Sequence, residues 1–140
     1  MLTLRQIDKA ITGLLLKNFP NIEVQESDVE EGFQRPSFFV SLETNRTETF
    51  QFNRVRDMTC RIYYFPSDRY VYSAEVQDVQ DQLESIFGLN FKVEDRIITI
   101  DDAESYEVDK VLQYSFDFTY YEDTGEEEKG EKMKELSYNE

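Results

Sequence analysis

Histidine is absent from this chain of 140 residues. Ser-His-Asp and Cys-His catalytic arrangements and histidine-ligated metals are therefore excluded, and the usual general base near neutral pH is missing. The five glycines are scattered and form neither a Walker pattern nor a G-x-G-x-x-G loop for nucleotide phosphates. The sequence thus excludes the commonest kinds of catalytic and nucleotide-binding site.

Cys60 is the only cysteine, which rules out an intrachain disulfide and any zinc or iron-sulfur site made of several cysteines. It falls on the apolar face of a predicted strand, where we interpret the thiol as an inert core group. A lone cysteine also indicates a reducing compartment.

Carboxylates are the one reactive class that remains. They cluster twice, in residues 28–31 and in residues 101–104, and such groups can bind hard cations or act as acid-base pairs. The members are Asp28, Glu30 and Glu31, and Asp101, Asp102 and Glu104. Neither cluster has the EF-hand spacing with its turn glycine, and adjacent acids arise by chance in so acidic a chain. We therefore expect no metal, no cofactor and no enzymatic activity.

The formal net charge of -15 disfavours binding to a phosphate backbone. Arg54, Arg56 and Arg61 form the only local basic cluster, and we interpret them as arginines on exposed strand positions. The N-terminus carries no basic-then-apolar signal sequence, and no apolar run approaches the ~20 residues of a membrane helix. We expect an intracellular protein with no membrane partner.

The elements that must position these residues are organised around Val111 to Tyr121. Apolar and polar side chains alternate there almost without error, which is typical of a strand with one buried face. Leu112, Tyr114, Phe116 and Phe118 point one way, and the intervening polar residues point the other. Strands with partly apolar faces are also predicted over 22–27, 37–42 and 58–65. Residues 91–93, and residues 98–100 after Glu94–Asp95, predict a hairpin with a two-residue turn, for which Asp95–Arg96 is a poor sequence.

Two amphipathic helices are predicted. The first covers residues 4–18, with Thr3 and Gln6 in capping-box positions, and Pro20 ends it. The second begins near Ser73 and ends before Gly88, with its apolar stripe at Val76, Val79, Leu83, Ile86 and Phe87. Three segments between elements carry no clear period: 28–35 predicts a surface loop, 43–57 either a long loop or an extended hairpin, and 101–109 an acidic connection.

This order of elements predicts an α+β fold, a mainly antiparallel mixed β-sheet with both amphipathic helices packed on one face. We expect a single domain over residues 1–121 and an acidic, flexible C-terminal tail over 122–140, which holds eight acids and three lysines. The strand residues expected to meet the helices are Phe38, Val40, Leu42, Met58, Cys60, Ile62, Leu112, Tyr114, Phe116 and Phe118.

Aromatic residues exceed what one small core can hide: there are nine tyrosines and eleven phenylalanines. Aromatics concentrate at the buried centres of interfaces, so those predicted to lie opposite the core suggest a self-associating sheet face. A slipped register, or cover by the loop that carries Phe50 and Phe52, explains them equally well. The candidate subunit or partner interface comprises Phe39, Phe50, Phe52, Arg54, Arg56, Arg61, Tyr63, Phe65 and Tyr121.

Specific stretches resemble the tail terminator (tail completion) family of long-tailed bacteriophages and prophages. They are N-F-P-N-I-E-V and E-E-G-F-Q-R-P-S-F-F-V-S-L between residues 18 and 42, and M-T-C-R-I-Y-Y-F-P over 58–66. The resemblance implies a structural α+β subunit that assembles with itself, commonly as a hexameric ring, on the completed tail tube. The ring would stop tube polymerisation and present a surface to the head-tail connector protein. The family shares no catalytic residues.

The resemblance further implies assembly in the bacterial host cytoplasm and a final place in the virion tail. At Gly32, Phe33, Pro36, Phe38 and Phe39 the family match marks the start of a strand, which we assign to folding first and to subunit contact second. Carboxylates lining such a ring would repel passing DNA, which would slide through without specific binding. Two alternatives are another head-tail connector or tail completion protein, and an acidic regulatory module that mimics nucleic acid.

Overall fold

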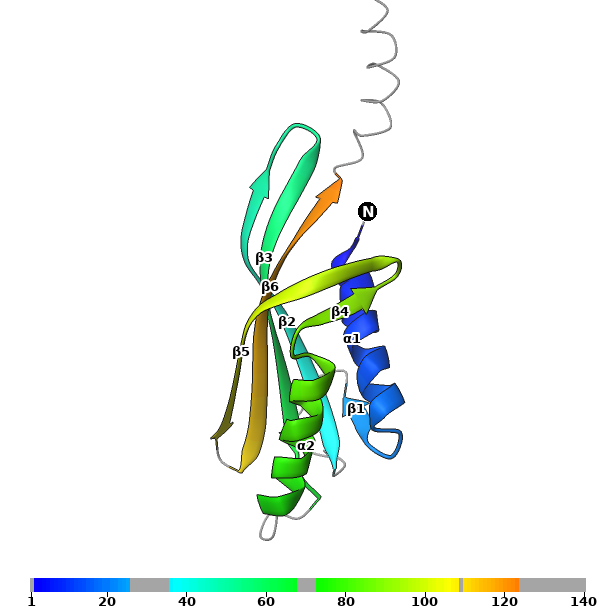
Figure 1. Cartoon of the computed structure of the whole chain (residues 1–140), viewed down its shortest axis with the longest axis vertical. Coiled ribbons are helices and arrows are strands. Elements are labelled where there is room, and N and C mark those ends of the chain that lie inside the picture. The colour runs from blue at the N-terminus through cyan, green and yellow to red at the C-terminus, as the bar shows by residue number, and fades with distance from the viewer. Residues whose placement is uncertain (1, 26–35, 68–72, 109, 124–140) are drawn as a thin grey trace, which may run out of the picture.

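The computed structural model of the chain describes residues 2–25, 36–67, 73–108 and 110–123. Two helices and six strands make an α+β fold, as predicted, and the sheet order is β1-β2-β3-β6-β5-β4 (Figure 1). The elements are α1 (Leu4–Asn18), β1 (Glu23–Gln25), β2 (Ser37–Thr49), β3 (Asn53–Phe65), α2 (Ser73–Ile86), β4 (Asn90–Val93), β5 (Arg96–Val108) and β6 (Val111–Asp123). Only the β1–β2 pair is parallel.

Both helices form where the sequence predicts them. The hydroxyl of Thr3 accepts a hydrogen bond from the Gln6 backbone N–H at 3.1 Å, and the Gln6 side chain accepts one from the Thr3 N–H at 2.9 Å. This capping box satisfies two N–H groups that the first turn leaves without helical partners. Gly88 follows α2, and a Cβ there would lie 2.3 Å from the carbonyl oxygen of Glu84, so a side chain at this position would clash with the helix backbone.

The segment left open as loop or hairpin is a hairpin. Strands β2 and β3 pair antiparallel from Ser37 and Phe65 up to Thr49 and Arg54, and the Phe50 N–H donates to the Asn53 carbonyl at 2.7 Å across the turn. The strands of this hairpin form although their side chains are mostly polar, because the backbone groups of the two strands supply the hydrogen bonds. The hairpin reaches well past the helices (Figure 1).

The prediction of an acidic connection over residues 101–109 is wrong, because β5 continues through this segment to Val108. It pairs antiparallel with β6 from Ile100 onward. The hydrophobic periodicity of the sequence does not reveal this part of the strand, because most of its side chains are exposed on both faces and need not alternate between apolar and polar. The predicted two-residue turn between β4 and β5 is confirmed: Val93 pairs with Arg96, and Glu94 takes a positive φ of 56°.

Strand boundaries differ at two further places. Strand β1 is three residues long, shorter than the predicted 22–27, and β6 runs two residues past the predicted end at Tyr121. The predicted loop 28–35, including Gly32 and Phe33, and residues 124–140 of the predicted tail lie outside the described residues. Neither described helix is long and apolar enough to cross a membrane.

One core joins both helices to the same face of the sheet. Phe116 lies near its centre, with ring centroids 5.1 Å from Phe87 and 5.6 Å from Phe91. The predicted core strand residues are buried, except that Val40 and Leu42 are only half-buried against its margin. The helix residues that cover the sheet are Ile7, Ile11, Leu15, Val76, Val79 and Leu83.

Candidate functional site

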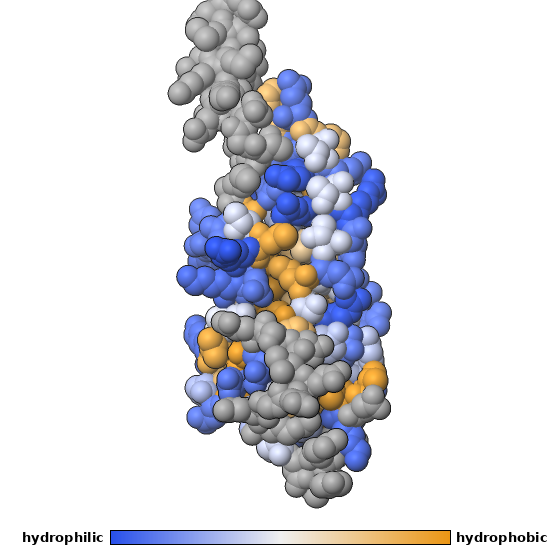
Figure 2. Space-filling model, turned by 180° about the vertical axis from the view of Figure 1, so that it is seen from behind, coloured by the Kyte–Doolittle hydropathy of each residue, from blue (hydrophilic) through white to orange (hydrophobic). Residues whose placement is uncertain are grey.

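The structure places three of the candidate interface residues together at the end of the β2–β3 hairpin. Phe50, Phe52 and Tyr121 are 52%, 47% and 59% exposed. Tyr121 reaches this cluster because it pairs with Val55 across the β3–β6 ladder. Together they line a shallow hollow of about 440 Å³, which we call the tip patch. Figure 2 shows apolar surface at this end of the molecule. Exposed aromatic clusters of this kind are typical of binding surfaces.

Arg54 and Arg56 are not exposed as predicted. Both are half-buried on the helix-bearing face of the sheet, below the tip patch, and both face Glu122. The Glu122 carboxylate is 2% exposed and lies 2.7 Å from Arg54 Nε and 3.6 Å from Arg56 Nη2. The 2.7 Å contact is not aligned for a hydrogen bond, so its attraction is that of an ion pair. One carboxylate thereby offsets part of the charge of the two guanidinium groups within the subunit.

Arg56 also donates a 3.0 Å hydrogen bond to the hydroxyl of Tyr120. Burial raises the pKa of Tyr120, and the hydrogen bond and charge of Arg56 partly offset this. The base of the hairpin is thus fixed by a partly buried polar cluster. Sequence reasoning missed Glu122 because it ended the domain at Tyr121. The alternation of Phe118, Tyr120 and Glu122 on one face was the signal that could have revealed it.

The opposite face of the sheet carries a polar network. Asn45 donates to the Thr59 hydroxyl at 2.6 Å, and that hydroxyl donates to Asp117 at 2.6 Å. Arg61 forms an ion pair with Glu43, so it is neutralised inside the subunit. On the same face Thr119 donates to Asp57 at 2.8 Å. These contacts stabilise the four-stranded centre of the sheet without apolar side chains.

Aromatic residues occupy the same face nearer the start of β2. Phe39 and Tyr63 are half-buried and stack with ring centroids 5.7 Å apart. Their register agrees with the prediction, so a slipped register does not explain them. The loop that carries Phe50 and Phe52 does not cover them, because it lies at the other end of β2. At the rise per residue of a β-strand, this is roughly 35 Å away. Phe65, also predicted here, is buried.

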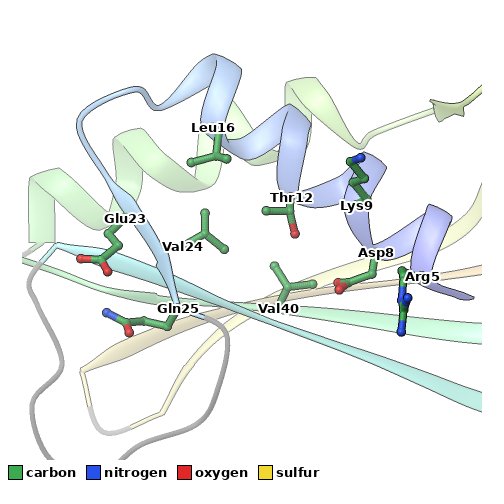
Figure 3. A pocket seen from close by; sticks show the side chains of 9 residues that line it. All are labelled: Arg5, Asp8, Lys9, Thr12, Leu16, Glu23, Val24, Gln25 and Val40. Carbon is green, nitrogen blue, oxygen red and sulfur yellow. The ribbon is translucent and has the colours of Figure 1, made fainter.

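A groove that sequence reasoning missed runs between α1 and the start of the sheet. It measures about 560 Å³, and Figure 3 shows Leu16, Val24 and Val40 converging on it beneath the helix. Arg5 and Lys9 of α1 also line it. Seen from behind, apolar residues gather near the middle of the molecule between hydrophilic neighbours (Figure 2). No single segment signals the groove, because helix and strands supply its sides separately.

Reactive chemistry is not apparent in the described part of the chain. Cys60 is fully buried, and burial raises the pKa of its thiol, which disfavours the nucleophilic thiolate. No three described His, Cys, Asp or Glu residues are grouped so as to hold a metal ion. Asp101 accepts a 3.4 Å hydrogen bond from Thr119, and Asp102 accepts one from the Ala103 N–H at 3.0 Å. The cluster at residues 28–31 lies outside the described residues.

Comparison with models of protein families identifies the family of this chain. The family model described as phage tail terminator protein matches residues 6–131. The chain belongs to the phage tail terminator family. This confirms the resemblance noted in the sequence, and membership of a structural tail family implies a non-enzymatic component of the virion tail. The regulatory nucleic-acid mimic is thereby set aside.

Two other comparisons add little to this assignment. No curated protein matches the chain. Among solved structures, one chain of 10% sequence identity aligns over 89% of this chain and 97% of its own length with a TM-score of 0.43. A likeness at this level supports no conclusion about fold or function.

Proposed function

We propose that copies of this tail terminator assemble into a ring, a hexamer as the family resemblance implies, that caps the completed tail tube. The observation that supports it is the tip patch. Phe50 and Phe52 at the turn of the β2–β3 hairpin and Tyr121 on β6 expose their aromatic side chains to solvent, outside the core. Exposure of this much apolar surface is unfavourable in an isolated subunit and becomes favourable when a partner covers it.

The proposed mechanism is steric. A tail tube grows by adding identical subunits to its end, and a ring with a different outward face leaves no site for the next one. The tip patch would contact the tail tube protein, and the opposite side of the ring would receive the head-tail connector protein. Phe39 and Tyr63, with Phe65 and Arg61 beside them, remain predicted subunit contacts. Arg54 and Arg56 would act by holding the hairpin in position through Glu122.

The polar face of the sheet is the proposed lining of the bore. It carries Asp57, Asp117 and Glu104, and the chain as a whole is strongly acidic. Negative charge on the bore repels a phosphate backbone, so DNA would pass without binding specifically. Assembly would take place in the host cytoplasm before the tail joins the head.

The test is electron microscopy of particles made without this protein and then with variants. Without it we expect overlong tails. A variant with both Phe50→Ser and Phe52→Ser should fold normally and still give overlong tails, because those side chains contribute little to the core. Ile97→Ser, which removes a similarly exposed apolar residue on β5, is the matched control and should restore normal length. Tails of normal length that lack heads would instead identify a connector, and would refute the terminator role.

A further inference from the structure

The sheet has two long open edges. Strand β1 pairs with β2 only at Ser37–Phe39, so no described strand pairs with the outer side of β2 from Val40 to Thr49. At the other side, β4 pairs with β5 only at Arg96–Thr99, and the next N–H, of Ile100, donates to the Leu89 carbonyl at 2.9 Å. From Asp101 to Val108 the described residues offer β5 no second neighbour. Open edges this long invite pairing with another chain.

The directions of the two edges are complementary. Strands β2, β3, β6 and β5 are joined by three successive antiparallel pairings, so β2 and β5 run in opposite directions. In a ring, neighbouring copies are related by rotation about one axis, so β5 of one copy would lie antiparallel to β2 of the next. All the long strand pairs within the subunit are antiparallel too. We propose that the open edge of β5 (101–108) pairs antiparallel with the open edge of β2 (40–49) of a second copy.

Charge favours this pairing over the pairing of like edges. The β5 edge carries Asp101, Asp102, Glu104 and Glu107, and none of these forms an ion pair with a described residue. Two such edges would repel each other.

The β2 side carries charges of both signs, including two cations on α1. Its own acids, Glu43 and Glu48, are already paired with Arg61 and Arg46. Above the edge, Arg5 and Lys9 of α1 line the groove together with Asp8 and Glu23, and neither cation forms an ion pair with a described residue (Figure 3). Glu107 pairs with Leu112 and so lies on the face of the sheet that α1 covers, which makes it the β5 acid that would meet these cations.

Apolar side chains lie at both edges, on different faces of the sheet. On β5, Tyr106 and Val108 are 42% and 50% exposed, and the register places them on the face that carries Phe39 and Tyr63, where a neighbouring copy could bury them. On β2, Val40 and Leu42 are half-buried and, with Leu4 of α1, line a second hollow continuous with the groove. Each edge thus supplies exposed backbone hydrogen-bonding groups and apolar side chains, the combination by which an added strand gains affinity and specificity. Repeated around the ring, the pairing leaves neither of the two long edges open.

The first test is crosslinking, and it rests on the proposed ring. Thr47→Cys on β2 and Ala103→Cys on β5, which lie on the same face of the sheet, are introduced singly and together and treated with a short bismaleimide in purified tails and in solution. Cys60 is buried, so the parent protein gives a clean background. We expect a ladder of covalent multimers up to ring size from the double variant and none from either single variant. Dimers from Thr47→Cys alone would show that two β2 edges pair, and would overturn the proposal.

The second test exchanges charges. One variant carries Arg5→Glu and Lys9→Glu, and the other carries Glu107→Lys. Each alone should fail to form rings, because like charges then meet at every interface, while both remain folded by circular dichroism. An equal mixture should form rings, since each groove then faces a strand of opposite charge. Light scattering and electron microscopy measure both outcomes.

The results separate this inference from the proposed function. Rings without a ladder, or mixtures that do not recover, would overturn edge pairing and leave the terminator role standing. Absence of rings on assembled tails would overturn both.

Discussion

Replacing Glu122 with glutamine tests whether the polar cluster beneath the tip patch stabilises the hairpin. Glu122 is almost fully buried, and it is the only described carboxylate that pairs with Arg54 and Arg56. Glu122→Gln keeps the size of the side chain and removes its charge. Two guanidinium groups then lose their counter-ion in a partly dry environment, which is unfavourable.

The magnitude follows from how much water reaches the arginines. Removing one partner of a fully buried ion pair costs about 3–5 kcal/mol. The side chains of Arg54 and Arg56 remain 28% and 17% exposed, so water solvates them in part. We therefore expect Glu122→Gln to lower the free energy of unfolding by about 1–3 kcal/mol. For a domain of this length that corresponds to a Tm lower by about 4 °C for each kcal/mol.

Urea unfolding followed by circular dichroism, together with a thermal melt, measures the change. The control is Asp81→Asn, which removes a carboxylate from the exposed face of α2 and should change stability by less than about 0.5 kcal/mol. If Glu122→Gln is as stable as this control, the carboxylate does not hold the hairpin and our explanation of the cluster fails.

Three further predictions concern the core. Phe116→Ala should lower the free energy of unfolding by about 3–5 kcal/mol, because the cavity left among its ring neighbours cannot fully collapse; an unchanged urea midpoint would contradict the central place of Phe116. Burial raises the pKa of Tyr114 to about 12 from its usual 10, so the stability that this tyrosine contributes is complete below pH 10 and is lost as the pH rises toward 12. Tyr114→Phe should flatten that loss in urea titrations at several pH values, and an equally steep loss would point to another group. Cys60 should not react with a thiol reagent at about pH 8 until the protein unfolds, because burial disfavours its thiolate; rapid labelling of the folded protein would show that the core opens.

Both helices were predictable because each carries its own signals. The capping box at Thr3 and the apolar stripe of α2 are local patterns, and a helix forms its hydrogen bonds within one segment. Strands with one buried face were also predictable, since Phe116 and its neighbours alternate with polar residues. The extent of β5 was not, because a strand exposed on both faces has no alternation to reveal it.

The sequence predicted which residues belong to the candidate site, but it did not predict how they group into surfaces. Aromatic excess identified Phe50, Phe52 and Tyr121, yet only the pairing of Tyr121 with Val55 brings them together. The same reasoning placed Arg54 and Arg56 in solvent, because strand parity alone does not say that a carboxylate, Glu122, pairs beside them.

By itself, the sequence determined the class of this protein and the chemistry that it lacks. The absence of histidine and the scattered positions of the glycines exclude several types of catalytic and nucleotide-binding site. Hydrophobic periodicity and helix-capping residues specify the helices and the half-buried strands, because these signals lie within a few consecutive residues. Tertiary structure alone decided which surfaces exist. The tip patch, the groove beneath α1 and the open edges of β2 and β5 each combine segments far apart in the chain, and register between strands is set by the packed whole and by no local pattern.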